Sequence, residues 1–209
     1  RNFERIGACE EAWLGDVRPA TPDEARAPAW APIDVLEKRG VERALKAIEK
    51  AFGHLRIGEG MRLYDAELAD NYGLESDISR ARKHEDYERI DQVPDDAIAQ
   101  MYWALSFFDR PGFVFHVGAY MRWSLRHLWS DEGSMSPDFT VYALDVPGTS
   151  EDLRPWRVTR GEAFDRAQCE AVVGFLRVMS SFEAGDPTVA RRALPWWEER
   201  VRALGGDPP

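Results

Sequence analysis

Apolar residues recur at helical spacing in three segments of the chain. They are Leu36, Val41, Ala44, Leu45, Ile48 and Phe52 in the first, Ile98, Met101, Tyr102, Leu105 and Phe108 in the second, and Cys169, Val172, Val173, Leu176 and Met179 in the third. Steps of three and four residues place such side chains on one face of a helix. The spacing predicts helices over about residues 34–52 and 94–108, and a third helix between Asp165 and Gly185.

A last helix is expected to begin at Asp186-Pro187, because an acidic residue followed by proline suits a helix start. Pro195 has no backbone N–H, so it is expected to interrupt or restart this helix. The pair Gly205-Gly206 then marks its end.

Two short runs of β-branched and aromatic residues favour strands. Residues 113–117 follow the turn signal Asp-Arg-Pro-Gly at 109–112, and residues 139–144 follow a polar loop. The segment after Gly118 is helix-like, and residues 145–160 read as a loop. The whole pattern predicts an α+β fold that is mainly helical, with two or three short strands.

The first 33 residues differ from the rest of the chain. Pro19, Pro22, Pro28 and Pro32 exclude a regular helix between residues 15 and 33. Trp30 lies among them and would cost solubility if it were exposed. We therefore expect residues 1–33 to form an extended N-terminal arm packed on the body, and residues 34–209 to form one mainly helical domain.

Charge and composition narrow the classes of partner. The chain has 209 residues with 27 basic and 37 acidic side chains, a formal net charge of −10. A protein that binds duplex nucleic acid is normally basic, so nucleic acid is disfavoured as a partner. No apolar stretch approaches the ~20 residues of a membrane span. Two cysteines, Cys9 and Cys169, make no disulfide framework, so we expect reduced thiols and a cytoplasmic location.

Residue motifs for catalysis or metal binding are absent from the sequence. The four histidines are His54, His84, His116 and His127, and none has the spacing of a metal-binding pair. There is no phosphate-binding glycine loop and no nucleophile elbow. We expect no metal, no cofactor and no catalytic residue. We expect His116 to have a structural role, and Asp138 and Asp145 to be ordinary loop acids. A pocket joining His116, Tyr120 and Asp138 would instead favour an enzyme.

Two surface features remain after these exclusions. The chain has eight tryptophans, among them the adjacent pair Trp196-Trp197, which cannot both point inward from one helix. Residues 65–96 contain eleven acidic and four basic side chains. Such a stretch is either a solvated helical face or a surface that attracts a basic partner. The residues we expect to contact that partner are Asp65, Glu67, Asp70, Glu75 and Asp77.

The segment ALSFFDRPGFVFHVGAYM, residues 104–121, resembles the signature of a bacterial domain family of unknown function, catalogued as family 6714. Further matches to that family's pattern are Pro94, Asp95 and Asp96 upstream, Gln168, Val172, Phe175 and Leu176 downstream, and Asp186, Ala193, Leu194 and Trp197 near the end. The resemblance covers about residues 40–200 and implies a shared fold with no known activity. His116-Val117-Gly118 departs from the family's usual Tyr-Leu-Pro, so chemistry at His116 would not be shared by the family.

These observations favour a binding protein over an enzyme. We expect an immunity or antitoxin-like protein that neutralises a bacterial toxin through an acidic, aromatic-containing surface. An acidic inhibitor suits a basic nuclease toxin because it mimics phosphate charge. The alternatives are a module that binds a small molecule or peptide in an aromatic groove, or an enzyme whose site the sequence does not reveal.

Overall fold

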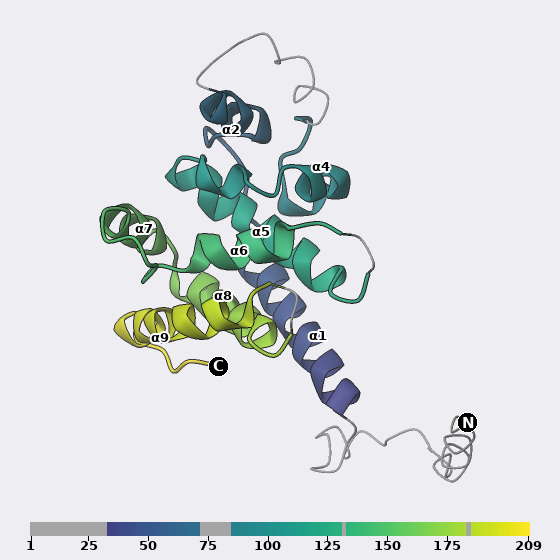
Figure 1. Ribbon diagram of the computed structural model, residues 1–209, viewed down its shortest axis with the longest axis vertical. Coiled ribbons are helices and arrows are strands. Elements are labelled where there is room, and N and C mark those ends of the chain that lie inside the picture. Colours follow the sequence, from purple (N-terminus) through teal and green to yellow (C-terminus); the bar gives the residue numbers. More distant parts are fainter. Residues whose placement is uncertain (1–32, 72–84, 131–132, 183–184) are drawn as a thin grey trace, which may run out of the picture. The chain divides into compact units, whose positions relative to one another are not determined.

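A computed structural model describes residues 33–71, 85–130, 133–182 and 185–209 (Figure 1). The chain divides between Leu36 and Glu37, and the second unit, Glu37–Pro209, is the one described below. The predicted N-terminal arm, residues 1–33, lies outside the described residues except for its last one. Its packing therefore stays a prediction.

The described residues form helices and connecting loops. In chain order the helices are α1 (Ile33–Phe52), α2 (Leu63–Asp70), the short 3₁₀ helix η4 (Ile90–Gln92), α4 (Asp95–Gln100), the 3₁₀ helix η5 (Ala104–Ser106), α5 (Arg110–Arg126), α6 (Ser136–Leu144), α7 (Arg154–Gly161), α8 (Arg166–Met179) and α9 (Pro187–Ala203). No strand occurs among the described residues. The predicted α+β class is therefore wrong, and the described part of the fold is all-helical.

Both predicted strands are helices in the structure. Residues 113–117 lie inside α5, and residues 139–144 form most of α6. The supposed turn at 109–112 is a helix start: the Asp109 carboxylate accepts a hydrogen bond from the Gly112 N–H at 2.9 Å, with Pro111 in the first turn. Because α5 is buried around most of its circumference, its apolar run is continuous and resembles that of a buried strand.

Two further helix predictions need correction. The helix expected over 94–108 ends at Gln100, and the 3₁₀ helix η5 follows it as a separate element. The helix α9 runs from Pro187 to Ala203 with Pro195 inside it, so the expected interruption does not occur. A proline within a helix removes one backbone hydrogen bond, a loss that surrounding packing can offset.

The other helix predictions are confirmed. The helix α1 matches the predicted 34–52 closely. The helix α8 begins after Asp165, whose carboxylate accepts from the Gln168 N–H at 2.8 Å, while the Gln168 side chain accepts from the Asp165 N–H at 3.0 Å. This reciprocal pair satisfies two N–H groups that a helix start otherwise leaves free. The last helix starts at Asp186-Pro187 as expected.

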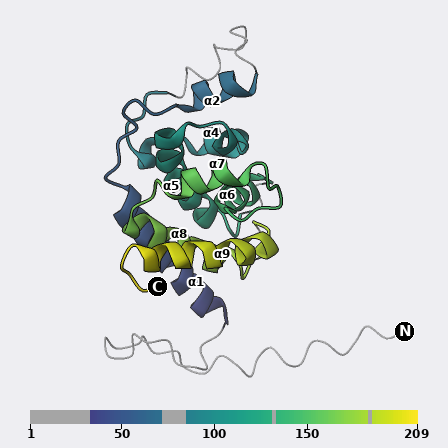
Figure 2. The same ribbon diagram turned by 90° about the vertical axis from the view of Figure 1, so that its left-hand side faces the viewer.

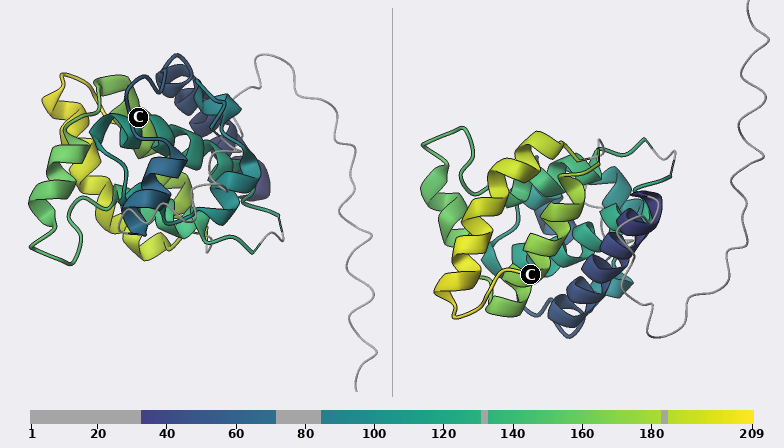
Figure 3. Two further views of the ribbon diagram at one scale, coloured as in Figure 1. Left: turned by 90° about the horizontal axis from the view of Figure 1, so that it is seen from above. Right: turned by 90° about the horizontal axis from the view of Figure 1, so that it is seen from below.

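The core lies around α5 (Figure 2). The helix α6 packs against α5, and it also contacts the neighbouring pair α8 and α9, which lie side by side (Figure 3). Gly118 lets α1 approach α5, since a Cβ atom at this position would lie 2.8 Å from the Phe52 side chain. No helix in the described ranges is both long and apolar enough to cross a membrane.

Candidate functional site

The predicted partner-binding acids lie partly on α2. Asp65 is half-buried, and its carboxylate accepts a hydrogen bond from the Arg62 N–H at 2.9 Å, which fixes the start of α2. Glu67 is also half-buried, and Asp70, at the end of the helix, is exposed. Glu75 and Asp77 lie outside the described residues. Of the three acids on α2, Asp70 is thus the most accessible to a partner.

Further carboxylates of the same acidic stretch lie on the loop before η4, on η4 and on α4. The exposed acids of the stretch in the described residues are Asp70, Asp86, Glu88, Asp91, Asp95 and Asp96, and we call this set the acidic surface. Three of them face a cation: Glu88 pairs with Arg62, Asp91 with Arg89, and Asp95 with Arg126. Within the described part of the chain, the other three acids make no ion pair. Their charge is open to solvent and to a partner.

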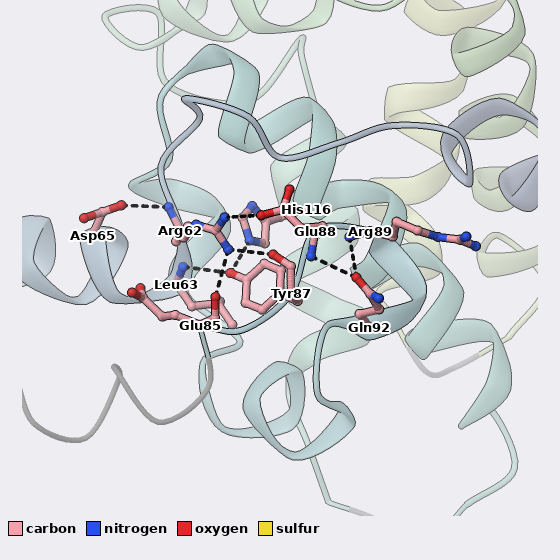
Figure 4. A network of polar contacts seen from close by, with 9 residues as sticks. All are labelled: Arg62, Leu63, Asp65, Glu85, Tyr87, Glu88, Arg89, Gln92 and His116. Carbon is pink, nitrogen blue, oxygen red and sulfur yellow. Dashed lines mark hydrogen bonds and ion pairs between the residues drawn. The ribbon is translucent and has the colours of Figure 1, made fainter.

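Arg62 joins the two segments that carry the acidic surface (Figure 4). Its Nη1 donates to the backbone carbonyls of Glu85 at 2.9 Å and Tyr87 at 2.6 Å, and its Nη2 donates to Glu88 Oε1 at 3.0 Å. One guanidinium therefore ties the start of α2 to residues 85–88. The planar fork of arginine suits this role, since it presents several donors in fixed directions.

A chain of hydrogen bonds continues inward from α2 to α5 (Figure 4). The Leu63 N–H donates to the Tyr87 hydroxyl at 3.1 Å, and this hydroxyl lies 2.8 Å from His116 Nε2. On the other side of the ring, His116 Nδ1 lies 2.8 Å from the Gly112 carbonyl oxygen. A carbonyl can only accept, so Nδ1 carries the proton, Nε2 accepts, and Tyr87 donates to it. The imidazole is neutral, and both of its nitrogens are occupied.

Burial explains the protonation of this pair. His116 is fully enclosed, with the Phe108 ring stacked on it at 4.0 Å between centroids. Desolvation disfavours the charged imidazolium and lowers the pKa of His116 to about 3. Desolvation likewise raises the pKa of Tyr87 well above its usual range. Both shifts keep the imidazole and the phenol neutral near pH 7, and the pair links α2 to α5 through its hydrogen bonds.

The other groups considered for chemistry have hydrogen-bond or ion-pair partners other than His116. Tyr120 donates its hydroxyl hydrogen to the Met101 carbonyl at 2.6 Å. Asp138 and Asp145 lie at opposite ends of α6 with separate partners. Asp145 is buried and pairs with Arg192, whereas burial raises the pKa of Asp138 near Gly185. No hydrogen bond joins His116, Tyr120 and Asp138, and the described residues hold no group of three metal-ligating side chains.

The tryptophans divide between the core and the surface. Trp197 is 1% exposed and donates its indole N–H to the Leu144 carbonyl at 2.8 Å. Trp196 packs edge-on against it and stays partly exposed, so the prediction that both cannot point inward is confirmed. Trp129 and Trp156 are exposed at 55% and 44%. These two are the most exposed tryptophans in the described residues.

The sequence pattern missed Arg62 and Tyr87. Their contacts join residues about 25 apart in the chain, across the residues that the structure does not describe. No motif or periodicity marks them, because a hydrogen bond between loop segments requires no regular spacing. They nonetheless connect the start of α2 and residues 85–88 to the core.

The sequence profile of DUF6714, described as a family of unknown function, matches residues 42–201. The chain belongs to this family. The matched residues include α2, η4, α4 and α5, so they contain the acidic surface and the Tyr87–His116 link. No curated protein and no solved structure matches the chain. Membership therefore confirms the resemblance seen in residues 104–121 and brings no activity with it.

Proposed function

We propose that this DUF6714 protein binds a basic protein partner through the acidic surface and neutralises it, as an immunity protein neutralises a toxin. The observation that carries the proposal is the contrast between the interior and the surface. The buried groups His116, Tyr87 and Tyr120 are occupied by internal hydrogen bonds, whereas Asp70, Asp86 and Asp96 are exposed without an ion pair among the described residues. This contrast supports binding over catalysis.

Charge of one sign on a rigid surface accelerates association with a partner of the opposite sign. Such steering raises association rates by tenfold or more at low salt, and it weakens as ions screen the charges. Arg62 connects the start of α2 to residues 85–88, and the Tyr87–His116 hydrogen bond connects Tyr87 to α5, so this part of the acidic surface is anchored to the core. A rigid surface loses little conformational freedom on binding, which favours a tight complex.

Trp129 is the aromatic residue that we assign to the same interface. Arg126 Nη1 lies 3.9 Å from Asp95 Oδ2, which places the end of α5 beside α4. Trp129 follows three residues later, is 55% exposed, and rests edge-on against Phe182. An exposed tryptophan beside charged groups is a typical anchor in protein interfaces.

The proposal includes a cytoplasmic location. An immunity protein would meet its toxin there, and a reducing compartment would keep thiols free. The Cys169 thiol is free and buried, which is compatible with such a compartment.

The test uses the full chain and the product of its neighbouring gene as the candidate toxin. Association rates would be measured at low and moderate salt for the parent and for the triple variant Asp70→Lys, Asp86→Lys and Asp96→Lys. We expect the triple variant to associate at least tenfold more slowly at low salt, with a flatter salt dependence. Trp129→Ala should instead speed dissociation, because it removes buried contact area.

The matched control changes the same amount of charge elsewhere. Glu151, Asp152 and Asp207 are exposed acids outside the acidic surface, and their triple Lys variant carries the same net charge as the test variant. Circular dichroism would check that both variants are folded. Equal slowing in both triple variants would assign the effect to overall charge and refute the proposed surface. A neighbouring gene product that does not bind the parent would refute neutralisation of that toxin.

A further inference from the structure

The outer side of α6 carries exposed apolar side chains at helical spacing. Met135, at the start of the helix, Phe139 and Tyr142 are separated by four and three residues, so they lie on one face. Met135 is 48% exposed, Tyr142 is 46% exposed, and Phe139 is half-buried. The Phe139 ring packs edge-on against Tyr142, at 6.2 Å between centroids, and against Tyr102, at 4.7 Å. We call these four residues the aromatic face.

Two serine side chains fix the start of α6 against α4. Ser136 Oγ donates to the Ile98 carbonyl oxygen at 2.6 Å, and Ser134 Oγ donates to the Ala99 carbonyl oxygen at 3.0 Å. Tyr102, which follows α4, is thereby kept beside α6. The aromatic face is therefore built from two segments of the chain that are bonded to each other.

Two carboxylates border the aromatic face. The Tyr142 hydroxyl donates to Asp186 Oδ2 at 2.9 Å, a bond between residues 44 apart in the chain. Asp138 lies one helical turn before Tyr142, on the same side of α6. In the described ranges neither acid forms an ion pair. Arg192 acts electrostatically on Tyr142 and Asp186, but its guanidinium is held by Asp145. Negative charge thus exceeds positive charge beside the aromatic face.

Asp186 retains capacity for a cationic donor. Its Oδ1 accepts from the backbone N–H groups of Thr188 and Val189 at 3.1 and 3.2 Å, whereas Oδ2 accepts, among the described residues, only from Tyr142. Since each carboxylate oxygen has two lone pairs, Oδ2 has room for another donor. Partial burial and the neighbouring charge of Asp186 raise the pKa of Asp138, so the two acids repel each other. A cation beside them would relieve this repulsion.

We propose that the aromatic face binds an arginine side chain of a protein partner, with the guanidinium group stacked on the Tyr142 ring and an N–H donated to Asp186. Arginine suits both parts of the site, because its guanidinium is planar, weakly hydrated and rich in donors. The ring attracts a cation placed over it, and a charged donor strengthens the hydrogen bond to a carboxylate. The compact, strongly hydrated ammonium group of lysine gains less from stacking.

Charge decides between this partner and the other possible occupants of an apolar face. A second copy of the chain would bring a formal net charge of −10 towards a face bordered by Asp138 and Asp186. An acidic partner would place like charges against each other, which is costly. A partner that presents arginine supplies the charge that the face lacks. The site shares no residue with the acidic surface, so it stands apart from the proposed neutralisation of a toxin.

The experiment titrates the full chain, labelled with nitrogen-15, with the peptide acetyl-Gly-Arg-Gly-Arg-Gly amide and follows the backbone amide signals by NMR. The same peptide with lysine in place of arginine is the control for charge. We expect the signals of Phe139 and Tyr142 to shift saturably with the arginine peptide. The dissociation constant measured from these signals should be at least about threefold larger for the lysine peptide, because stacking on an exposed ring contributes that much.

Two substitutions separate the Tyr142 ring from its hydroxyl. Tyr142→Ala removes the ring and should weaken binding of the arginine peptide at least about threefold. Tyr142→Phe keeps the ring and frees Asp186 Oδ2, so this variant should bind the peptide as tightly as the parent. Leu153→Ala, at a residue outside the aromatic face that is 49% exposed, should leave the binding unchanged.

Asp186→Asn tests the charge without removing a helix cap. Asparagine caps helix starts as well as aspartate does, and it tolerates the left-handed backbone of this residue, whose φ is 44°. The variant should weaken binding of the arginine and lysine peptides alike, by about twofold to fivefold. Asp165→Asn, the same change at the exposed cap of α8, should leave both dissociation constants unchanged.

Three results of the titrations would overturn the proposal. They are shifts that grow linearly with peptide concentration, equal dissociation constants for the two peptides, and a loss in Tyr142→Phe as large as that in Tyr142→Ala. Sedimentation equilibrium at the concentration used for NMR tests the alternative of a second copy. A parent dimer that Tyr142→Ala converts to a monomer would assign this face to self-association and would also overturn the proposal.

Discussion

The hydroxyl of Tyr87 is the most informative single group to remove, because it connects two buried partners. Tyr87→Phe keeps the ring, which stacks on Phe115 at 6.2 Å between centroids, and deletes only the oxygen. The Leu63 N–H then loses its acceptor, and His116 Nε2 loses its donor. Both groups are fully enclosed, so water cannot replace the hydroxyl without a rearrangement.

The size of the effect follows from these two unsatisfied groups. A buried polar group left without a partner costs about 1–3 kcal/mol. Two such groups would together cost about 2–6 kcal/mol. Part of this cost is offset, because the phenylalanine variant has no hydroxyl that must be desolvated on folding. We expect Tyr87→Phe to lower the free energy of unfolding by about 2–4 kcal/mol. For a domain of this size, each kcal/mol lowers Tm by about 2–4 °C.

The assay is reversible unfolding in urea with a parallel thermal scan. Tyr102→Phe is the matched control, because the Tyr102 ring packs edge-on against Phe139 and its hydroxyl makes no hydrogen bond among the described residues. It should change the stability by less than about 0.5 kcal/mol. A double-mutant cycle with His116→Phe should give a coupling energy of about 0.5–3 kcal/mol, since the two side chains share one bond.

The reasoning fails if Tyr87→Phe is as stable as the Tyr102→Phe control. That result would mean that the Tyr87 hydroxyl is not enclosed in solution, or that water reaches both of its partners. An additive double-mutant cycle would contradict the hydrogen bond between Tyr87 and His116 in particular.

Two further predictions concern pH and packing. In the folded state His116 is neutral with a pKa of about 3, whereas in the unfolded chain it binds a proton near the ordinary pKa of about 6.5. The unfolded state therefore binds more protons between these values, and the unfolding free energy should fall by at most about 4 kcal/mol as the pH drops from about 6.5 to 3. Urea titrations across this range should show a shallower pH dependence in His116→Phe than in the parent, while His54→Gln, at an exposed position, should keep the parent's slope. Leu176→Ala, at a fully buried position of α8, should lower the stability by about 2–5 kcal/mol, and a loss below about 1 kcal/mol would show that this face of α8 is not in the core.

The local sequence was sufficient to predict the helices that bury only one face. The helices α1 and α8 each bury one face, so their apolar residues recur every three or four positions and the sequence shows the period directly. The starts at Asp165 and Asp186 could be read for a similar reason, since capping depends on residues within one turn. Cys169, which the apolar spacing places on one face of this helix, is buried on α8.

The tertiary structure decided what the local pattern leaves open. Residues 113–117 form a continuous apolar run because neighbouring helices enclose α5, and such a run fits a buried strand as well as a buried helix. In α6, Thr140, Val141 and Leu144 are buried while Tyr142 is exposed, and a run of six residues is too short for its period to separate a helix from a strand. Pro195 stays within α9, since the packing of the whole helix outweighs one missing backbone bond.

The contacts that hold the candidate sites together could likewise not be predicted from the sequence. Arg62 and Tyr87 meet across about 25 residues of chain, Tyr87 and His116 across 29, and Tyr142 and Asp186 across 44. Charge counts did identify residues 65–96 as acidic, because composition is a local property. The packing of distant segments decides which acids are exposed and which of them lack an ion pair. The reason is that burial determines both the energy of a charge and its access to solvent.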